Sequence, residues 1–236
     1  MVVKYHEYWD LVGVEQHSQF ESKLKDLLFK PEERKEFYDK LLKVKNDVST
    51  DTFKEYFELY AAERKTNQQD FTPDSIARLL TKLTRDNKNA EDGFKAYDSA
   101  AGTGTLLIAQ WNYDRVQVMP WNYYPHNYFY MAEELSDTAI IYLLHNLALR
   151  GMNAVVLHGD SIERKYKQVY FVQNSKDDHM LYSDINVMPH SKFLKKALNV
   201  REWADEPIKH IESQKVVWRG FDKEVSELEQ TSLFEE

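Results

Sequence analysis

Apolar residues recur at helical spacing through the first 65 residues of the chain. Two stripes stand out, Phe20, Leu24, Leu27 and Leu28, then Phe53, Tyr56, Phe57 and Tyr60. Residues three and four positions apart lie on one face of a helix, and Thr52-x-x-Glu55 has the form of a capping box before the second stripe. We therefore predict a helical N-terminal domain over residues 1–65.

From residue 66 the pattern changes to short apolar runs that alternate with helical segments. Strands are predicted over residues 94–98, 128–131, 153–158 and 168–174. The helix that follows Thr72 and Pro73 has one apolar face, formed by Ile76, Leu79, Leu80 and Leu83. Strands that alternate with helices are typical of an α/β fold, which we place at residues 66–220.

A turn of small residues, 99–104, connects the first strand to an apolar helix start at Thr105. Gly102 and Gly104 let the backbone pass close to a ligand that a side chain would block. Strand, tight turn and helix are together typical of a nucleotide-type cofactor site. Turns of this kind also form for packing reasons alone.

Acidic residues close three of the predicted strands. They are Asp98, the pair Glu133-Glu134, and Asp160. Ligands of open α/β sheets bind beyond the carboxyl ends of the strands, so these side chains are expected to converge on one crevice. Two alternatives stay open. Glu133 and Glu134 could belong to the first turn of the next helix, and Asp160 could be a turn former after Gly159.

The segment Asp98-Ser-Ala-Ala-Gly-Thr-Gly104 resembles the D-P-A-C/A-G-S/T-G motif of adenine-N6 DNA methyltransferases. Phe71-Thr72-Pro73 resembles their F-T-P helix start, and the likeness continues through Glu134-Leu135 and residues 146–151 to Gly159-Asp160-Ser161. It covers residues 66 to 175 and is greatest to the methylation subunit of type I restriction-modification systems. The resemblance implies a Rossmann-like sheet that uses S-adenosylmethionine.

The resemblance also implies roles for single residues. The methionine end of the cofactor would be covered by Phe71, Thr72 and Pro73 and cradled by Asp98, Ala100, Gly102 and Gly104. Glu134, with Glu133 as the near alternative, would accept hydrogen bonds from the ribose hydroxyls. Asp160 would accept a hydrogen bond from the adenine amino group of the cofactor.

The family's catalytic N/D-P-P-Y/F motif follows the fourth strand, where the asparagine and a proline carbonyl hold the target amine in line with the methyl group. Here the residues are Asn174-Ser-Lys-Asp177, without the prolines or the aromatic residue. Asn174 would still orient the amine, and Tyr182 or residues 186–189 could replace the missing parts.

Two functions are therefore predicted. The first is S-adenosylmethionine-dependent methylation of adenine N6 in DNA. The second is that of a catalytically degenerate protein which binds the cofactor and acts as a regulatory or decoy subunit. Methylation of a protein or an RNA is a third possibility, because it accounts for the missing prolines.

The formal net charge of −8 does not favour DNA, so DNA binding would need a local basic face or a partner such as a specificity subunit. In the acidic C-terminal segment, residues 221–236, Gln230, Leu233 and Phe234 resemble the Q-x-x-L-F peptide that docks replication proteins on the bacterial sliding clamp. Alternatively, Leu233 and Phe234 fold back on the core.

Three further features bear on location and cofactors. The chain has no cysteine, which agrees with a cytoplasmic protein. No apolar run approaches the roughly 20 residues that cross a bilayer, so no membrane partner is expected. The histidines lack the paired spacing of metal ligands, and no metal site is predicted.

Overall fold

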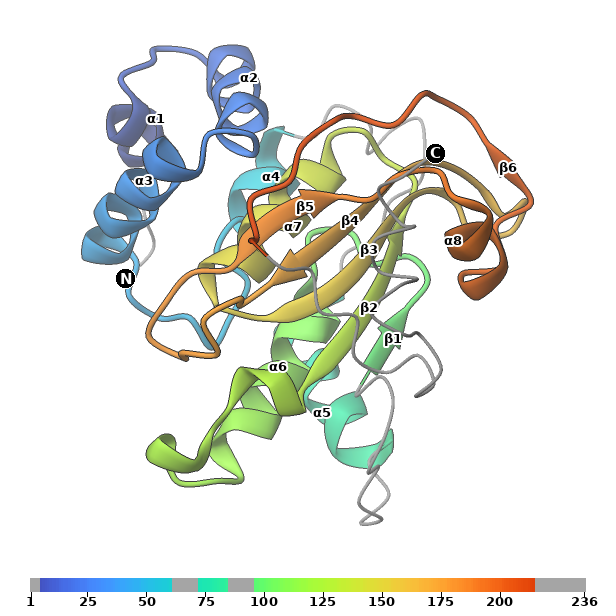
Figure 1. Ribbon diagram of the computed structural model, residues 1–236. Coiled ribbons are helices and arrows are strands. Elements are labelled where there is room, and N and C mark those ends of the chain that lie inside the picture. Colours follow the sequence, from blue (N-terminus) through green and yellow to red (C-terminus); the bar gives the residue numbers. More distant parts are fainter. Residues whose placement is uncertain (1–4, 61–71, 85–95, 215–236) are drawn as a thin grey trace.

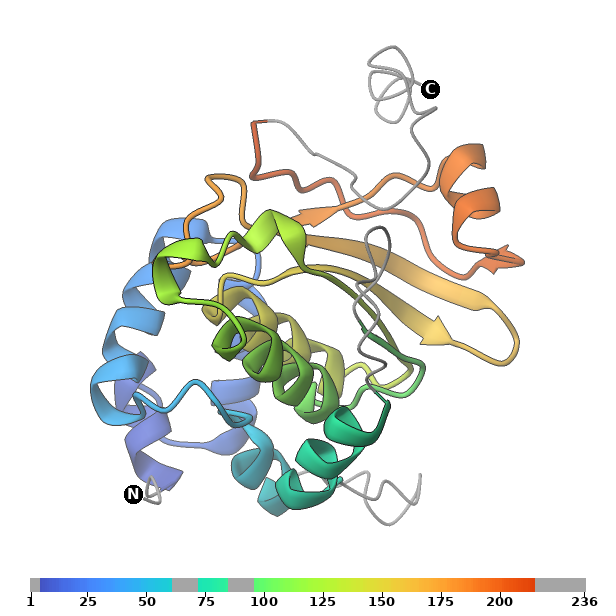
Figure 2. The ribbon, with the colours of Figure 1, turned by 90° about the horizontal axis from the view of Figure 1, so that it is seen from below.

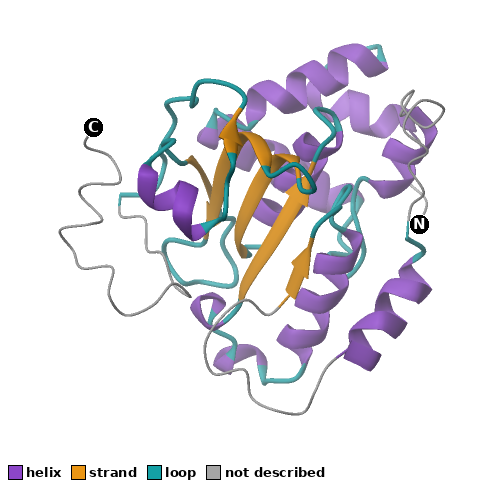
Figure 3. Cartoon of the chain, turned by 90° about the vertical axis from the view of Figure 1, so that its right-hand side faces the viewer, coloured by secondary structure: helices purple, strands orange, loops and turns teal. Residues whose placement is uncertain are grey.

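The structure, a computed structural model, describes residues 5–60, 72–84 and 96–214. Its strands form one layer with helices on both sides (Figures 1 and 3). The N-terminal part contains α1 (Tyr5–Val12), α2 (His17–Leu27), α3 (Pro31–Val44) and α4 (Lys54–Tyr60). The helical periodicity of this part is thereby confirmed. The predicted boundary at residue 65 falls outside the described residues.

Six strands of the described chain form a single sheet in the order β1-β2-β3-β4-β5, with β6 paired to β4. They are β1 (Ala96–Asp98), β2 (Phe129–Glu134), β3 (Asn153–Asp160), β4 (Lys165–Gln173), β5 (Asp184–Val187) and β6 (Glu202–Trp203). The first three strands are parallel. The α/β class predicted from the sequence is confirmed by this sheet and its helices.

Helices connect the parallel strands. α6 (Thr105–Val116) lies between β1 and β2, and α7 (Ala139–Leu149) lies between β2 and β3. Two short 3-10 helices, η2 (Pro120–Asn122) and η3 (Pro125–Asn127), precede β2. α5 (Asp74–Thr84) comes before β1, and α8 (Lys192–Ala197) follows β5.

β4 does not continue the parallel pattern. It pairs antiparallel with β3, and β5 pairs antiparallel with β4. Only residues 161–164 separate β3 from β4, whereas a parallel crossover needs about a dozen residues. The end of β4 therefore lies at the edge where β1, β2 and β3 begin. For this reason β4 does not bring Asn174 to the carboxyl ends of β1, β2 and β3.

The two faces of the sheet are covered by different elements. In β3, Ala154 and Val156 belong to a buried cluster with α6, α7 and the N-terminal helices, whereas Val155 and Leu157 belong to a second cluster with α8. Figure 2 shows α6 and α7 on one face and α8 on the other. Alternate residues of a strand point to opposite faces, so β3 is apolar throughout because both faces are buried.

α7 is the central helix of the core. All of its residues are buried, because it packs between the sheet and the N-terminal helices. Its polar residues His145 and Asn146 form hydrogen bonds to that N-terminal part, for example from Asn146 to Asp51 and between His145 and Tyr38. Within the described ranges, the structure has no helix long and apolar enough to cross a membrane.

Candidate functional site

The turn between β1 and α6 has the backbone geometry that its two glycines permit. Gly102 has φ of +56° and Gly104 has φ of +98°, both in the left-handed region that favours glycine. A Cβ on Gly104 would lie 2.8 Å from Leu143 Cδ1, whereas a Cβ on Gly102 would have no atom within 4 Å. Gly104 therefore lets α6 pack against α7, and Gly102 leaves open space beside the backbone.

Asp98 closes β1 at the start of this turn. Its Oδ1 accepts a hydrogen bond from the backbone N–H of Ala100 at 3.1 Å. Burial raises the pKa of the Asp98 carboxyl, and the Ala100 N–H opposes part of that rise. Ala100 itself is exposed on the turn. Asp98 and Ala100 thus lie beside Gly102 as the sequence predicts.

Glu134 joins the end of β2 to the same turn. Its carboxylate accepts hydrogen bonds from Gly102 N and from Ser136 N, each at 2.7 Å, and only 5% of the residue is exposed. Burial raises its pKa; the two N–H groups oppose the rise and the charge of Asp98 adds to it. Asp98, Gly102 and Glu134 are therefore brought together at the carboxyl ends of β1 and β2.

Glu133 points to the other face of the sheet, as its position next to Glu134 in a strand requires. It is fully buried and accepts two hydrogen bonds from Arg164 Nη1, at 2.8 and 3.0 Å. The hydroxyls of Tyr97 and Tyr166 also donate to it. This network ties β2 to the β3–β4 turn. Of the two adjacent glutamates, Glu134 faces the glycine turn.

Asp160 ends β3, one strand further along the sheet. Its Oδ1 accepts hydrogen bonds from the backbone N–H groups of Ile162 and Glu163, both at 2.8 Å. These bonds stabilise the tight connection to β4. Asp160 therefore makes the contacts expected of a turn-forming residue. Asp160 lies at the carboxyl edge with Asp98 and Glu134, and its side chain bonds to the backbone of its own turn.

The predicted helix start at Thr72 and Pro73 lies just before α5, which begins at Asp74. Lys54 of α4 anchors it, since its Nζ donates to Thr72 O at 2.5 Å and pairs with Asp74 at 3.1 Å. Phe71 falls outside the described residues, as do Gln230, Leu233 and Phe234.

The apolar face that the sequence predicts for α5 is not its buried face. Its buried side faces α6 through small residues, Ala77 and Thr81. The apolar side chains of Ile76, Leu79, Leu80 and Leu83 are each more than 40% exposed. Among the described residues, the apolar face that periodicity identifies is therefore the more exposed side of this helix.

Asn174 lies at the opposite edge of the sheet, level with the start of β3. Its backbone N–H donates to Asn153 Oδ1 at 2.8 Å, and its Nδ2 donates to the carbonyls of Asp178, at 2.8 Å, and Gly151, at 3.2 Å. Its Oδ1 accepts from Asp178 N at 3.1 Å. The side chain is buried and closes the loop after β4. It is not brought together with Asp98, Gly102 and Glu134.

The predicted replacements for the missing catalytic residues also have structural contacts. Tyr182 donates a hydrogen bond to Asp39 at 2.8 Å and packs edge-on against Tyr38. Asn186 is fully buried and donates to Phe171 O and Ser213 Oγ. Tyr182 lies in the connection from β4 to β5. β5 runs parallel to β3, because both pair antiparallel with β4. Residues 187–189 therefore lie at the carboxyl edge of the sheet, four strands away from β1 and its glycine turn.

Asp51 is a residue of this region that the sequence did not single out. It is 4% exposed, and its Oδ1 accepts hydrogen bonds from the N–H groups of Phe53 and Lys54, at 3.0 Å each. It therefore caps α4, a role that the sequence pattern gave to Thr52. The Thr52 hydroxyl instead accepts from Arg150 at 3.0 Å. The sequence does contain a signal for this role, because aspartate is a favoured N-cap residue and Asp51 stands one position before Thr52.

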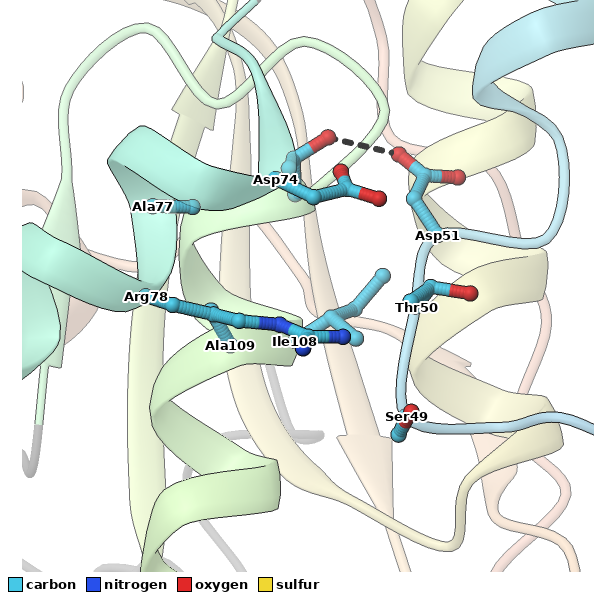
Figure 4. A pocket seen from close by; sticks show the side chains of 9 residues that line it. Ser49, Thr50, Asp51, Asp74, Ala77, Arg78, Ile108 and Ala109 are labelled. Atoms are coloured by element: carbon cyan, nitrogen blue, oxygen red, sulfur yellow. Dashed lines mark hydrogen bonds between the residues drawn. The ribbon is translucent and has the colours of Figure 1, made fainter.

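A small pocket lies next to Asp51, between residues 49–51, α5 and α6. Its lining comprises Ser49, Thr50, Asp51, Asp74, Ala77, Arg78, Thr105, Ile108 and Ala109. In Figure 4, Asp51 and Asp74 lie together at one end and Arg78 extends below them. With a volume of about 10 Å³, it holds a single water molecule at most.

Comparisons with known proteins agree with the sequence motifs. A family model described as N-6 DNA Methylase matches residues 44–221. Among solved structures, the chain is similar to the crystal structure of the type I restriction-modification system methyltransferase subunit from Streptococcus thermophilus, with 21% identity and a TM-score of 0.34. That match covers 48% of this chain and 24% of the other. No curated protein matches the chain.

Proposed function

We propose, from the premise that this chain belongs to the N-6 DNA methylase family, that its glycine turn and Glu134 bind S-adenosylmethionine. The open space beside Gly102 supports this, because a Cβ there would meet no atom within 4 Å. The methionine part of the cofactor would lie against this turn, beside Asp98 and Ala100. Thr72 and Pro73, together with Phe71, would cover it.

Glu134 has room for further hydrogen bonds although it already holds the turn. One of its oxygens accepts from Gly102 N and the other from Ser136 N. A carboxylate has about four acceptor positions, and the backbone N–H of Leu135 also bonds to it, so one ribose hydroxyl can be accepted without breaking these bonds. Asp160 would accept from the adenine amino group in the same way. When bound, the cofactor supplies an activated methyl group.

We further propose that the chain serves as a cofactor-binding, regulatory or decoy subunit and does not itself orient a target amine. The place of Asn174 carries this proposal. It is level with the start of β3, whereas Glu134 lies at the carboxyl edge. Strands rise about 3.3 Å per residue, so the separation is on the order of 20 Å, whereas reacting atoms must approach to about 3.5 Å.

Methyl transfer to adenine N6 by the chain itself is the second candidate, and family membership favours it. Both candidate functions imply DNA and a specificity subunit as partners. With a net charge of −8, DNA binding would in both cases need a local basic face or a partner that carries the DNA. Docking on a sliding clamp through Gln230, Leu233 and Phe234 stays a prediction.

The binding part is tested by titrating the purified chain with S-adenosylmethionine in a calorimeter. We expect binding by the natural chain and clear weakening in Gly102→Ala, whose methyl group would fill the space beside the turn. Gly13→Ala is the matched control, because Gly13 has a similar φ of +68° and equally open surroundings. Equal effects of both substitutions, or no binding by the natural chain, would contradict the proposal.

The proposal that the chain does not itself transfer a methyl group is tested by expressing it in a methylation-deficient bacterial host. We expect the N6-methyladenine content of its DNA, measured by mass spectrometry, to equal that of the empty vector. A signal that disappears in Asp98→Ala would establish the second candidate and overturn the regulatory one.

A further inference from the structure

The glycine turn is held from two sides. On the strand side, Ala101 N donates to Glu133 O at 3.0 Å and Gly102 N donates to Glu134 at 2.7 Å. On the other side, the hydroxyls of Thr103 and Thr105 donate to Asp51 Oδ2 at 2.5 and 2.9 Å. Asp51 comes from the loop before α4, more than 50 residues earlier in the chain.

Asp51 is well suited to this position because it is a pure acceptor. Besides the two hydroxyls, it accepts from Asn146 Nδ2 at 2.7 Å and from two backbone N–H groups of its own loop. A carboxylate can satisfy such a set of donors, whereas an amide would place an NH₂ group against some of them. Its charge also lies at the N-termini of α4 and α6, where the helix dipoles favour an anion.

The loop that carries Asp51 is fixed by α7. Arg150 donates to the carbonyls of Val48, at 2.9 Å, and Thr50, at 2.5 Å. Asn146 donates from Nδ2 both to Asp51 and to Thr103 O, the latter at 2.8 Å. The loop, α7 and the turn therefore form one buried hydrogen-bond network, in which the position of Thr103 depends on Asp51.

We infer that Asp51 is a positioning residue of the cofactor site: through Thr103 and Thr105 it fixes the left-handed conformation of the turn at Gly102 and Gly104. The inference rests on the proposed binding of S-adenosylmethionine at this turn. It makes the loop before α4 part of the site, although Asp51 itself touches the turn and not the cofactor. A turn left without Asp51 would sample other conformations, and binding would have to reorder it.

The test compares substitutions that remove or keep the hydrogen bond at nearly constant volume. Thr103→Val removes the hydroxyl that reaches Asp51, whereas Thr103→Ser keeps it. Asp51→Asn replaces the carboxylate, which accepts hydrogen bonds from both threonine hydroxyls, with an amide. Glu212→Gln is a stability control, because it breaks a buried ion pair with Arg34 between α3 and the chain after β6. All chains are measured well below their unfolding temperatures.

The first measurement is the dissociation constant of S-adenosylhomocysteine by calorimetry. We expect about tenfold weaker binding for Thr103→Val and Asp51→Asn, as for the loss of one hydrogen bond to a charged group. Thr103→Ser and Glu212→Gln should bind like the natural chain. Unchanged binding by Thr103→Val and Asp51→Asn would overturn the inference.

The second measurement needs no ligand and is amide hydrogen exchange at Gly102 and Gly104. We expect faster exchange of these two amides in Thr103→Val than in Thr103→Ser or Glu212→Gln. If the natural chain binds no cofactor, the proposed function fails, and the exchange result alone decides whether Asp51 fixes the turn. Equal exchange in Thr103→Val and Thr103→Ser would refute that role.

Discussion

His145 is a fully buried histidine between α7 and the N-terminal helices. Its Nε2 lies 2.8 Å from the Leu24 carbonyl and its Nδ1 lies 2.8 Å from the Tyr38 hydroxyl. A carbonyl only accepts, so Nε2 carries the hydrogen and Nδ1 accepts from Tyr38. Burial lowers the pKa of His145 to about 3. The neutral ring is therefore part of the packed core.

This pKa predicts that the protein loses stability as the solution becomes acidic. Below pH 6.5 the unfolded chain binds a proton at His145 that the folded chain does not bind until about pH 3. The free energy of unfolding should therefore fall across that window, by up to about 1.4 kcal/mol per pH unit for this group. Urea unfolding at pH 7 and pH 5 measures the loss.

His145→Gln isolates the contribution, because all other titrating groups are shared with the natural chain. Between pH 7 and pH 5 we expect the variant to lose about 2 kcal/mol less than the natural chain. The variant should be less stable at pH 7, since glutamine does not reproduce the ring contacts. Parallel losses in the two chains would show that His145 titrates normally when folded.

At the scale of elements, the reversed β4 gives Asn174 a structural task. The side chain joins the start of β3 to the loop after β4 through Gly151 and Asp178. The packing is close, since a Cβ on Gly151 would lie 2.9 Å from Asn174 Nδ2. Removal of this amide would leave buried backbone groups without their partner.

We expect Asn174→Ala to lower the free energy of unfolding by about 1–3 kcal/mol, the usual cost of unsatisfied buried polar groups. Its affinity for S-adenosylmethionine should not change. Ser175→Ala is the neighbouring control, because Ser175 is exposed and bonds only through its hydroxyl to Asp184. Urea unfolding and calorimetry give the two quantities. An affinity loss without a stability loss would place Asn174 in the cofactor site.

The first three strands and their acidic ends could be predicted because the signals are local. An apolar run, an acid and a glycine turn lie within a few residues of one another around Asp98, and an apolar run followed by an acid marks the strand that ends at Glu134. The direction of β4 was not predicted although a local signal existed, since the predicted strands leave only residues 159–167 between them, fewer than the dozen or so that a parallel crossover needs. Resemblance to the family's motif order outweighed that signal.

Asp51 and the outer face of α5 could not be predicted from pattern alone. Asp51 acquires its role from Thr103 and Asn146, which are distant in sequence, and periodicity carries no information on such pairs. For α5, the period of 3.6 residues identifies an apolar face but not what covers it. Small residues, Ala77 and Thr81, allow close approach to α6 instead.

At the scale of the whole molecule, a buried ion pair joins the two ends of the described chain. Arg34 of α3 donates to both carboxylate oxygens of Glu212, at 2.9 and 2.5 Å. Their side chains are 2% and 4% exposed. Glu212 also accepts from the backbone N–H of Ile185 in β5. Burial alone would raise the pKa of Glu212, but Arg34, the Ile185 N–H and His210 together outweigh it and the pKa is lowered.

Glu212→Gln should therefore be strongly destabilising, because it leaves the Arg34 charge buried without a counter-charge. Breaking one partner of such a pair costs about 3–5 kcal/mol. The surface pair of Lys23 and Glu33, at 3.1 Å, supplies the control, and Glu33→Gln should change the stability little because water screens this pair. Urea unfolding at pH 7 compares both variants with the natural chain.

The same experiment shows whether the N-terminal helices and the sheet unfold as one unit. Arg34 and Glu212 belong to different ends of the chain, and the N-terminal helices share one buried cluster with α7 and β3. We therefore expect one transition in both variants, with an unchanged dependence on urea. A first transition that appears only in Glu212→Gln would mean that the ion pair, rather than the shared core, couples the helices to the sheet. A cost near that of Glu33→Gln would mean that water reaches Arg34 and that the pair is not buried in solution.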